Sequence, residues 1–253
     1  MLSVAELEVT YANGVKALSR TSVSFERGRF IVLLGTSGAG KSTLLRCLNG
    51  LVRPTKGDVL VERRGSIFRS TRTLREHRRQ TGMVFQQHHL IGRMTALENV
   101  LTGRLAAHGT FRTLLPLARA DRILALEALA RVGLAERALH RADQLSGGQQ
   151  QRVGIARAIA QRPEIILADE PVASLDPETA VKVLGDLHRI CREDGITTIV
   201  SLHQLDLARK FADRIIGLAH GQIAFDGAPS DLGSSVLDKI YKVSSPALLE
   251  AAE

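Results

Sequence analysis

The stretch from residue 30 to residue 50 constrains the fold of this chain more than any other. Its first five residues are apolar, as in a buried strand of a parallel sheet, and leucines at helical spacing follow a glycine-rich loop. In a loop between a strand and a helix, glycines let backbone N–H groups turn toward phosphate oxygens, and the helix N-terminus adds partial positive charge. The loop consists of Gly35, Thr36, Ser37, Gly38, Ala39, Gly40, Lys41, Ser42 and Thr43.

Two side chains of this loop indicate what it binds. Lys41 is placed to reach terminal phosphates, and the Ser42 hydroxyl is placed to bind Mg²⁺. The alternative is a glycine-rich turn before an ordinary helix, which requires neither residue. The strand, the spacing, the Lys-Ser pair and the helix occur together, and they predict a nucleoside triphosphate site.

The composition indicates an intracellular globular chain. Its 253 residues suffice for one large domain or two small ones. The two cysteines, Cys47 and Cys191, provide no zinc or disulfide framework, which favours a reducing cytoplasm. The first residues lack the basic start and apolar core of a signal peptide, and no apolar run approaches the length of a membrane span.

Positive charge is concentrated in one segment of the chain. The formal net charge is +8, and seven arginines lie between residues 63 and 79. This cluster is compatible with a solvated helix close to a membrane and also with a specific anion site. Few aromatic residues and no Trp argue against stacking platforms for single-stranded nucleic acid.

The order of strands and helices predicts an α/β fold. We expect strands at residues 3–10, 15–25, 29–34, 58–62, 81–86, 164–168, 197–202, 214–218 and 222–225. Helical stretches between the later strands predict a mostly parallel sheet that is covered on both faces. A polar segment, residues 70–80, starts with Ser and Thr residues and predicts a surface helix that carries the basic cluster.

Residues 88–160 differ from their surroundings, because Leu, Ala and Arg recur there at helical spacing. We interpret this segment as an inserted helical subdomain. Within it, residues 121–132 predict an amphipathic helix with Ile123, Leu124, Leu126 and Leu129 on the apolar side. The tail from about residue 244 is expected to be loosely held.

An apolar strand at residues 165–168 ends in two acids, Asp169 and Glu170. Ligands of open α/β sheets gather at the carboxyl ends of strands. One carboxylate there is suited to hold Mg²⁺ and its neighbour to position an attacking water. The alternative is an acid pair that caps the next helix near Pro177.

A second glycine-rich helix start occurs at Leu145, Ser146, Gly147, Gly148 and Gln149. Ser146 and Gln149 fit a capping box, which is a sufficient structural reason for both. The two glycines are not required by capping, and a bare helix start with small residues is also an anion site. One nucleotide has no obvious need for two phosphate-binding helix starts from the same chain.

The L-S-G-G-Q motif, the phosphate loop and the L-A-D-E-P strand end together resemble the ATP-binding subunits of ABC transporters, from Leu7 to about Phe225. The resemblance implies a P-loop NTPase core with a mostly parallel sheet, an N-terminal antiparallel β subdomain and an inserted helical subdomain. The single nucleotide-binding domain, 1–253, then comprises a core with the antiparallel part at 1–87 and 161–243, the helical subdomain at 88–160 and a loose tail at 244–253.

The resemblance also implies roles for individual residues. Tyr11 matches the aromatic residue that stacks on adenine, although it also fits a half-buried aromatic at a strand end. His203 matches a switch histidine near the γ-phosphate, although a lone His at a strand end is often structural. Glu170 matches the general base, and Ser42, Gln86 and Asp169 match the ligands of Mg²⁺.

Further implications concern partners. Two copies pair head to tail, so that the phosphate loop of one faces residues 145–149 of the other across ATP. Gln86 also couples to transmembrane permease subunits, and Ser174, Leu175 and Asp176 form a loop that contacts the other copy. The chain is then a peripheral protein of the cytoplasmic face of the inner membrane. A solute-binding protein takes part indirectly, and no nucleic acid is expected.

A finer similarity concerns the cargo. Residues 84–105, residues 168–177 and the run D-G-I-T-T-I-V-S-L-H-Q are similar to the ATPases of phosphonate importers, whose related systems carry phosphite or hypophosphite. Two alternatives stay open. One is a transporter for another cargo, such as a polar amino acid or a lipoprotein. The other is a soluble ABC ATPase that acts on nucleic acid or ribosomes.

Overall fold

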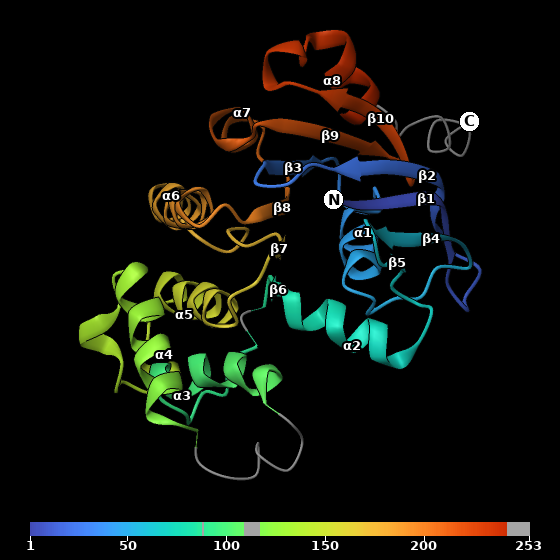
Figure 1. The fold of residues 1–253 in the computed structure, drawn as a ribbon. Coiled ribbons are helices and arrows are strands. Elements are labelled where there is room, and N and C mark those ends of the chain that lie inside the picture. The colour runs from blue at the N-terminus through green and yellow to red at the C-terminus, as the bar shows by residue number, and fades with distance from the viewer. Residues whose placement is uncertain (88, 109–116, 242–253) are drawn as a thin grey trace.

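The computed structural model describes residues 1–87, 89–108 and 117–241, and Figure 1 shows its two sheets and the helices around them. The larger sheet has six strands in the order β10-β9-β3-β8-β7-β6. All neighbours in it are parallel except β10, which pairs with β9 antiparallel. Its strands are β3 (Phe30–Leu34), β6 (Thr81–Val84), β7 (Ile165–Asp169), β8 (Thr197–Leu202), β9 (Arg214–Ala219) and β10 (Gln222–Gly227).

The apolar run of β3 is buried along its whole length because the sheet is covered on both faces. Phe30, Val32 and Leu34 pack into one hydrophobic cluster, and Ile31 and Leu33 pack into another on the opposite face. The first cluster includes α6 (Pro177–Glu193), and the second includes α1 (Lys41–Leu48). The predicted mostly parallel, doubly covered sheet is confirmed.

The smaller sheet is antiparallel and has the strand order β2-β1-β4-β5. It lies beside α1 in Figure 1, and its apolar residues share the second cluster with that helix. The antiparallel N-terminal part that the resemblance implies is therefore present. Its strands are β1 (Leu2–Thr10), β2 (Lys16–Phe25), β4 (Lys56–Val61) and β5 (Gly65–Ser66).

The predicted basic helix is α2 (Thr71–Gln80), and the side chain of Ser70 caps its start by accepting from the Thr73 N–H. This helix is more than a solvated surface element. His77 is 4% exposed, and its Nε2 is 2.6 Å from the carbonyl oxygen of Leu48. Arg78 donates to the carbonyl of Gly50 at 2.7 Å. Part of the basic cluster thus satisfies the carbonyl groups at the end of α1.

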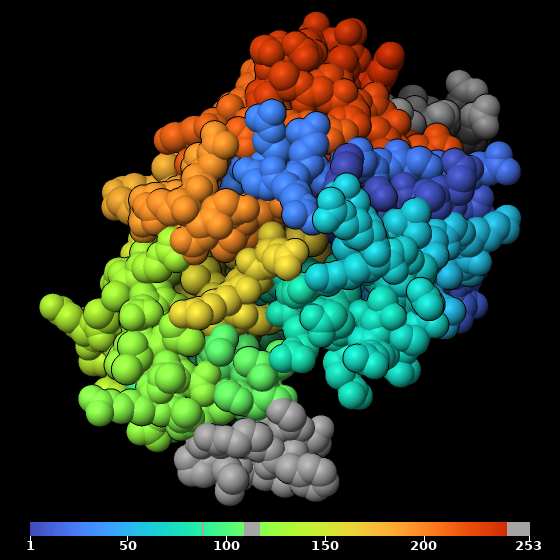
Figure 2. Space-filling view, in the orientation of Figure 1, coloured from blue at the N-terminus to red at the C-terminus, as the bar shows by residue number. Residues whose placement is uncertain are grey.

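Helices α3 (Ala96–Leu101), α4 (Arg119–Arg131) and α5 (Gly147–Ala160) pack together. In the space-filling view the residues of α3 and α4, coloured green, gather at one end of the molecule, away from the red C-terminal strands (Figure 2). The predicted division into residues 88–160 and a core stays a prediction, and the predicted tail, 244–253, lies outside the described residues. The remaining helices are α7 (Leu205–Phe211) and α8 (Ser234–Tyr241).

The predicted apolar face of α4 is wrong at two of its four residues. Leu129 is buried and Leu124 is half-buried, as predicted, whereas Ile123 and Leu126 are 47% and 41% exposed and the small Ala125 is buried. The physical reason is a buried carboxylate on the same face, Asp121, which accepts hydrogen bonds from side chains of the preceding segment at 2.9 Å. Alanines on this face let neighbouring helices approach closely, so the helix is oriented by small residues and a polar contact.

Several strand ends also differ from the prediction by one or two residues. Strand β6 ends at Val84, two residues before the expected end, whereas β7 continues through Asp169 and β10 continues through Gly227. Within the described segments, none of the helices combines the length and apolar character needed to cross a bilayer.

Candidate nucleotide site

The phosphate loop joins the end of β3 to the start of α1 at the carboxyl edge of the large sheet. Gly40 occupies the N-cap position of α1 with φ of 102°, a left-handed conformation that costs other residues energy. A Cβ atom at Gly40 would lie 2.7 Å from the carbonyl oxygen of Ala17, and one at Gly35 would lie 2.4 Å from that of Leu218. The loop therefore passes so close to neighbouring backbone that both positions require glycine.

Lys41 lies inside the loop with only 3% of its surface exposed. Its Nζ donates to the carbonyl oxygens of Gly35 at 2.8 Å and Thr36 at 2.9 Å, and it lies 3.9 Å from a carboxylate oxygen of Glu170. Burial lowers the pKa of the Lys41 ammonium, and the nearby carboxylates of Glu170 and Asp169 oppose this. The ammonium is thus held where phosphate oxygens of a nucleotide would lie.

Asp169 connects the loop to the strand ends of the sheet. The Ser42 hydroxyl donates to Asp169 Oδ1 at 2.7 Å, and the Ser201 hydroxyl donates to the same oxygen at 2.9 Å. The Asp169 side chain is buried, with a residue exposure of 5%. A hydroxyl and a carboxylate at this separation are hard oxygen ligands, which fit Mg²⁺ bound together with phosphate oxygens. Within the residues that the structure describes, no group of three or more His, Cys, Asp or Glu side chains is arranged for a metal.

Glu170 and His203 lie beside the same loop. His203 Nε2 contacts the Glu170 carboxylate, while its Nδ1 is 3.1 Å from the Gly35 carbonyl oxygen and 3.3 Å from Lys41 Nζ. Glu170 has φ of 46°, a left-handed conformation that is costly for a non-glycine residue. Its N–H donates to the Ser201 hydroxyl at 2.8 Å, which holds this backbone in place. Five predicted residues therefore meet at one edge: Lys41, Ser42, Asp169, Glu170 and His203.

The capping alternative for the two acids does not hold. Helix α6 is capped by Asp176, whose carboxylate accepts from the Thr179 N–H at 2.9 Å. The hydrogen bond from this N–H also lowers the pKa of Asp176. Asp169 and Glu170 are thus free of a capping role, whereas Asp176, the last residue of the predicted dimer loop, has a structural reason of its own.

The predicted capping box at the start of α5 is confirmed. The Gln149 N–H donates to the Ser146 hydroxyl, and the Ser146 N–H donates to Gln149 Oε1 at 3.0 Å. A Cβ at Gly148 would lie 2.6 Å from Thr179 Cγ2, so the close approach of α6 gives that glycine a packing reason. Across the described segments no hydrogen bond or ion pair joins residues 145–149 to the phosphate loop. A single chain does not bring the two helix starts together.

Two further predicted residues lie apart from the cluster around Asp169. Gln86 is exposed and, with Ser174 and Gln150, lines a cavity of about 450 Å³. Tyr11 is 37% exposed, and its hydroxyl lies 3.1 Å from Thr43 Oγ1, next to the phosphate loop. Stacking of Tyr11 on adenine and binding of Gln86 to Mg²⁺ stay predictions.

Ser201 is a residue that the sequence reasoning missed. It is fully buried near the end of β8, and its hydroxyl links the carboxylate of Asp169 to the backbone of Glu170. The available signal was a hydroxyl between two apolar residues, Val200 and Leu202, one residue before the end of a strand. A buried polar side chain in that position needs partners, and here they are the two acids.

Comparison with known proteins agrees with this geometry. A family model described as ABC transporter matches residues 18–173. The chain is 64% identical to the phosphite import ATP-binding protein of Stutzerimonas stutzeri, over 95% of this chain and 87% of that protein. It is 57% identical to a phosphonates import ATP-binding protein of Nostoc sp., over 95% of this chain and 92% of that protein.

Solved structures with the same fold include dimers. A dimeric ATP-binding cassette in a post-hydrolysis state, bound to ADP and phosphate, aligns with a TM-score of 0.79 and 37% identity, over 90% of this chain and 99% of that one. A dimeric bacterial ABC transporter cassette aligns with a TM-score of 0.80 and 36% identity over the same shares of the two chains.

Proposed function

The chain belongs to the ABC transporter family, and from this premise we propose that it is the ATP-hydrolysing subunit of an importer for a phosphonate or a related reduced-phosphorus oxyanion such as phosphite. The observation that carries the catalytic part is the cluster of Lys41, Ser42, Asp169, Glu170 and His203 around one glycine-rich loop. The cargo is supported by the names of the relatives that are 64% and 57% identical.

The loop residues 35–43 are suited to bind the phosphates of ATP, with Tyr11 beside them as a platform for the base. Mg²⁺ would be held by Ser42 and Asp169, with Gln86 as a further ligand, and it would neutralise charge on the phosphate oxygens. The two hydroxyl groups that donate to Asp169 keep its carboxylate oriented toward the loop. We assign ATP as the nucleotide because the family consists of ATP-binding subunits.

Hydrolysis requires a water molecule in line with the γ-phosphate and a group that orients it. The Glu170 carboxylate is the side chain in position to accept a proton from that water, because it lies beside the loop and is held by His203. Lys41 supplies a fixed positive charge where negative charge develops on the phosphate oxygens. His203, in contact with both Glu170 and the loop carbonyl, would sense the γ-phosphate.

The separate helix start at residues 145–149 supports a dimer. In one chain it is not joined to the phosphate loop, so a second copy placed head to tail would supply it to complete the site. Differential binding of ATP to the closed pair then shifts the population toward closure. Ser174 and Leu175, next to this helix start, would lie at the same interface.

Closure would drive transmembrane permease subunits through the region around Gln86, on the cytoplasmic face of the inner membrane. The exposed Gln86 cavity of about 450 Å³ is a surface that such a partner can reach. A solute-binding protein would deliver the oxyanion on the other side. The proposed assembly therefore contains this chain twice, the permease subunits and the solute-binding protein.

The test is uptake by cells whose only copy of the chain is wild type, Glu170→Gln or Glu26→Gln. Labelled methylphosphonate, phosphite, phosphate and glutamine are the cargoes. We expect Glu170→Gln to retain ATP binding and to lose ATP turnover together with methylphosphonate or phosphite uptake. Glu26 is an exposed acid remote from the loop, so Glu26→Gln should behave as wild type.

Each other outcome contradicts one part of the proposal. If the Glu170→Gln protein hydrolyses ATP at the wild-type rate, the catalytic assignment is wrong. If turnover is lost while uptake of both reduced-phosphorus cargoes persists, the importer assignment is wrong. Loss confined to glutamine uptake would move the chain to an amino acid transporter.

A further inference from the structure

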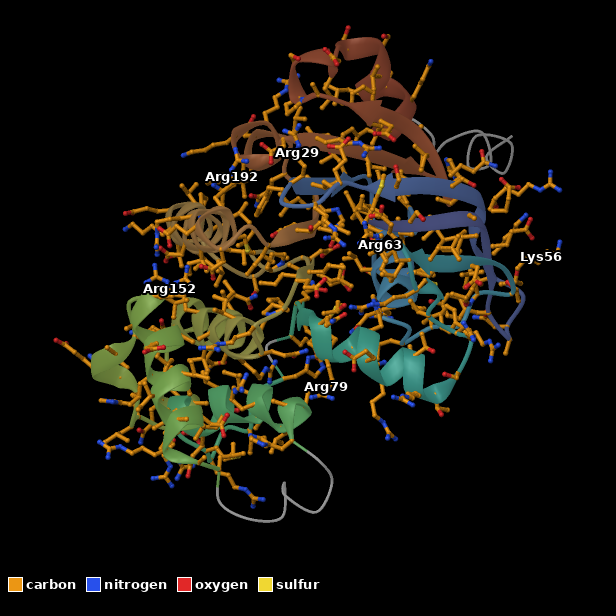
Figure 3. All side chains as sticks on the ribbon, viewed as in Figure 1. Arg29, Lys56, Arg63, Arg79, Arg152 and Arg192 are labelled. Carbon is orange, nitrogen blue, oxygen red and sulfur yellow. The ribbon has the colours of Figure 1, made fainter. Side chains whose placement is uncertain are left out.

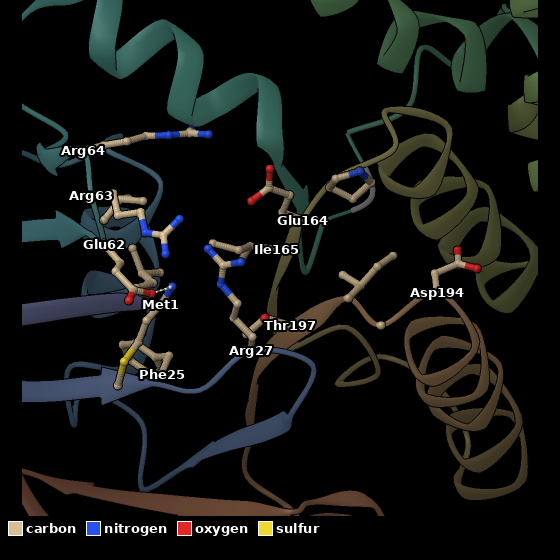
Figure 4. A pocket seen from close by; sticks show the side chains of 15 residues that line it. Met1, Phe25, Arg27, Glu62, Arg63, Arg64, Glu164, Ile165, Asp194 and Thr197 are labelled. Atoms are coloured by element: carbon tan, nitrogen blue, oxygen red, sulfur yellow. Dashed lines mark hydrogen bonds and ion pairs between the residues drawn. The ribbon is translucent and has the colours of Figure 1, made fainter.

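A second cavity lies at the edge of the large sheet opposite the phosphate loop. It has a volume of about 490 Å³, and Ile165 and Thr197, the first residues of β7 and β8, line it. Figure 4 shows these residues together with side chains from the β2–β3 loop and from the turn after β4. The cavity is thus separated from Asp169 and Glu170 by the length of the strands.

Three arginines line this cavity from two different parts of the chain: Arg27, Arg63 and Arg64. Figure 4 shows the guanidinium groups of Arg27 and Arg63 pointing toward one another across the cavity. Both groups interact electrostatically with the Glu62 carboxylate, which is itself ion-paired with the terminal amine of Met1 at 3.2 Å, and in the described parts of the chain neither group donates a hydrogen bond. Two guanidinium groups that face each other and share one carboxylate, itself already paired with an amine, leave positive charge that stabilises an added anion.

The turn that carries Arg63 holds it in place. Its φ of 65° is left-handed, and the next residue, Arg64, closes the turn by donating its N–H to the carbonyl of Val61 at 3.0 Å. The Arg64 side chain reaches Gln80 at the end of α2. The backbone geometry therefore sets the direction in which the Arg63 side chain leaves the turn.

The acids that line the cavity are largely engaged elsewhere. Glu62 forms an ion pair with the terminal amine of Met1 at 3.2 Å, and Asp194 forms one with Arg131 from α4. Among the described acids of this cavity, Glu164 is the one without an ion pair. With Asp194 neutralised by Arg131, the cavity holds three guanidinium groups and the Met1 amine against the carboxylates of Glu62 and Glu164, which leaves an excess of positive charge.

An adjoining cavity of about 420 Å³ increases the positive potential. It shares Arg63 and Arg64 with the first cavity and adds Arg69, Arg72 and one acid, Glu76, which is ion-paired with Arg79 at 3.9 Å. Arg72 lies in the first turn of α2, which contains no acid. Its positive charge therefore adds to the partial positive charge of the helix start. Figure 3 shows other basic residues, such as Arg152 and Lys56, far from Arg63, so this concentration is local.

The wall of the first cavity is apolar as well as basic. The half-buried side chains of Val61 and Ile165 line it beside the arginines. A volume near 490 Å³ is within the range of pockets that enclose small organic ligands. The wall suits an anion that carries a short hydrocarbon group, whereas free sulfate or phosphate would leave it uncovered.

We propose that this cavity binds a soluble organophosphonate, with the oxyanion between Arg27 and Arg63 and the hydrocarbon group against Val61 and Ile165. A tetrahedral phosphorus oxyanion presents two oxygens to each guanidinium, which matches the forked donors of arginine. The site is distinct from the nucleotide site. The proposal rests on the residues of this cavity alone and does not depend on the cargo of the transporter.

The experiment is calorimetric titration of the full chain with phenylphosphonate in the presence of saturating non-hydrolysable ATP analogue, which fills the phosphate loop. We expect binding by the wild type and an affinity at least about tenfold lower for Arg27→Gln and Arg63→Gln, because each variant loses charge-assisted hydrogen bonds. Glu164→Gln removes a like charge and should tighten binding about threefold. Arg122→Gln, an exposed arginine of α4, is the matched control and should bind as the wild type.

Affinity for the ATP analogue, measured for every variant, checks that each one is folded. The proposal is overturned if the folded Arg27 and Arg63 variants bind phenylphosphonate as the wild type does. It is also overturned if Glu164→Gln weakens binding, or if phenylphosphonate binds only when the nucleotide site is empty. Vesicles of phosphatidylglycerol provide the last arm, because binding to vesicles without binding of phenylphosphonate would assign the arginines to lipid head groups instead.

Discussion

Replacement of Ser201 by alanine tests how the two acids of the nucleotide site are held. The Ser201 hydroxyl donates to Asp169 Oδ1 at 2.9 Å and accepts from the Glu170 N–H at 2.8 Å. Loss of a hydrogen bond to a charged group costs about 1.5–3 kcal/mol, and an unsatisfied donor costs about 1–3 kcal/mol. Because both effects arise at one site and do not add fully, we expect a loss of about 3 kcal/mol in the free energy of unfolding.

For a domain of this size, that loss corresponds to a decrease of about 6–12 °C in Tm, measured by calorimetry. ATP affinity should change little because Lys41 and Ser42 are untouched. Turnover should fall at least about tenfold, equivalent to about 1.4 kcal/mol in the barrier, because the left-handed backbone at Glu170 loses its anchor.

The control for Ser201→Ala is Thr198→Val on the same strand. Thr198 is also fully buried, and its hydroxyl donates to the carbonyl of Ile196, away from the carboxyl end of β8. It should lose about 1 kcal/mol of stability and keep its turnover. The reasoning is refuted if Ser201→Ala retains the wild-type Tm and turnover, or if Thr198→Val slows hydrolysis as much as Ser201→Ala does.

Three further predictions concern other parts of the molecule. Ser146→Arg should bind ATP as a monomer but fail to dimerise in sedimentation with ATP; normal turnover would exclude a shared site. Leu129→Ala should lose about 2–5 kcal/mol in urea unfolding, whereas Ile123→Ala should stay within about 0.5 kcal/mol, and the reverse order would contradict the observed face of α4. Burial lowers the pKa of His77 below its ordinary value of 6.5, so the unfolded chain takes up a proton that the folded chain does not as the pH falls. The stability contributed by this histidine is present above pH 6.5 and is lost below it. Between about pH 7.5 and about pH 5.5, Tm should therefore fall less in His77→Gln than in the wild type. Equal slopes of Tm against pH would show that His77 is not the cause of the pH dependence.

The features that could be predicted from the sequence depend on local patterns. The run of β3 is apolar at every position because both faces of the sheet are covered, and the Lys-Ser pair follows it at a fixed spacing. The capping box of Ser146 and Gln149 needs only neighbours in the sequence. Such features are determined within one strand, one turn or one helix start.

The features that could not be predicted depend on contacts between distant segments. The face of α4 is oriented by Asp121, whose partners lie in an earlier segment, so Ile123 and Leu126 are left outside. The hydroxyl of Ser201 meets Asp169 because β7 and β8 are neighbours in register, with these two residues directly opposite. Helix periodicity and strand propensity contain no information on either contact.

The nucleotide site of one chain satisfies its own charges in this conformation. Lys41 donates to two carbonyl groups of its own loop, and the Glu170 carboxylate is engaged by His203. Phosphate oxygens must therefore replace existing partners of Lys41, so the net gain from one loop is smaller than the sum of its new contacts. At the start of α5, by contrast, the first N–H groups, those of Gly147 and Gly148, precede the hydrogen-bonded ladder of the helix and remain available as donors. A second copy that presents these donors to the same phosphates adds binding energy only in the closed pair, which is the condition for ATP to drive closure.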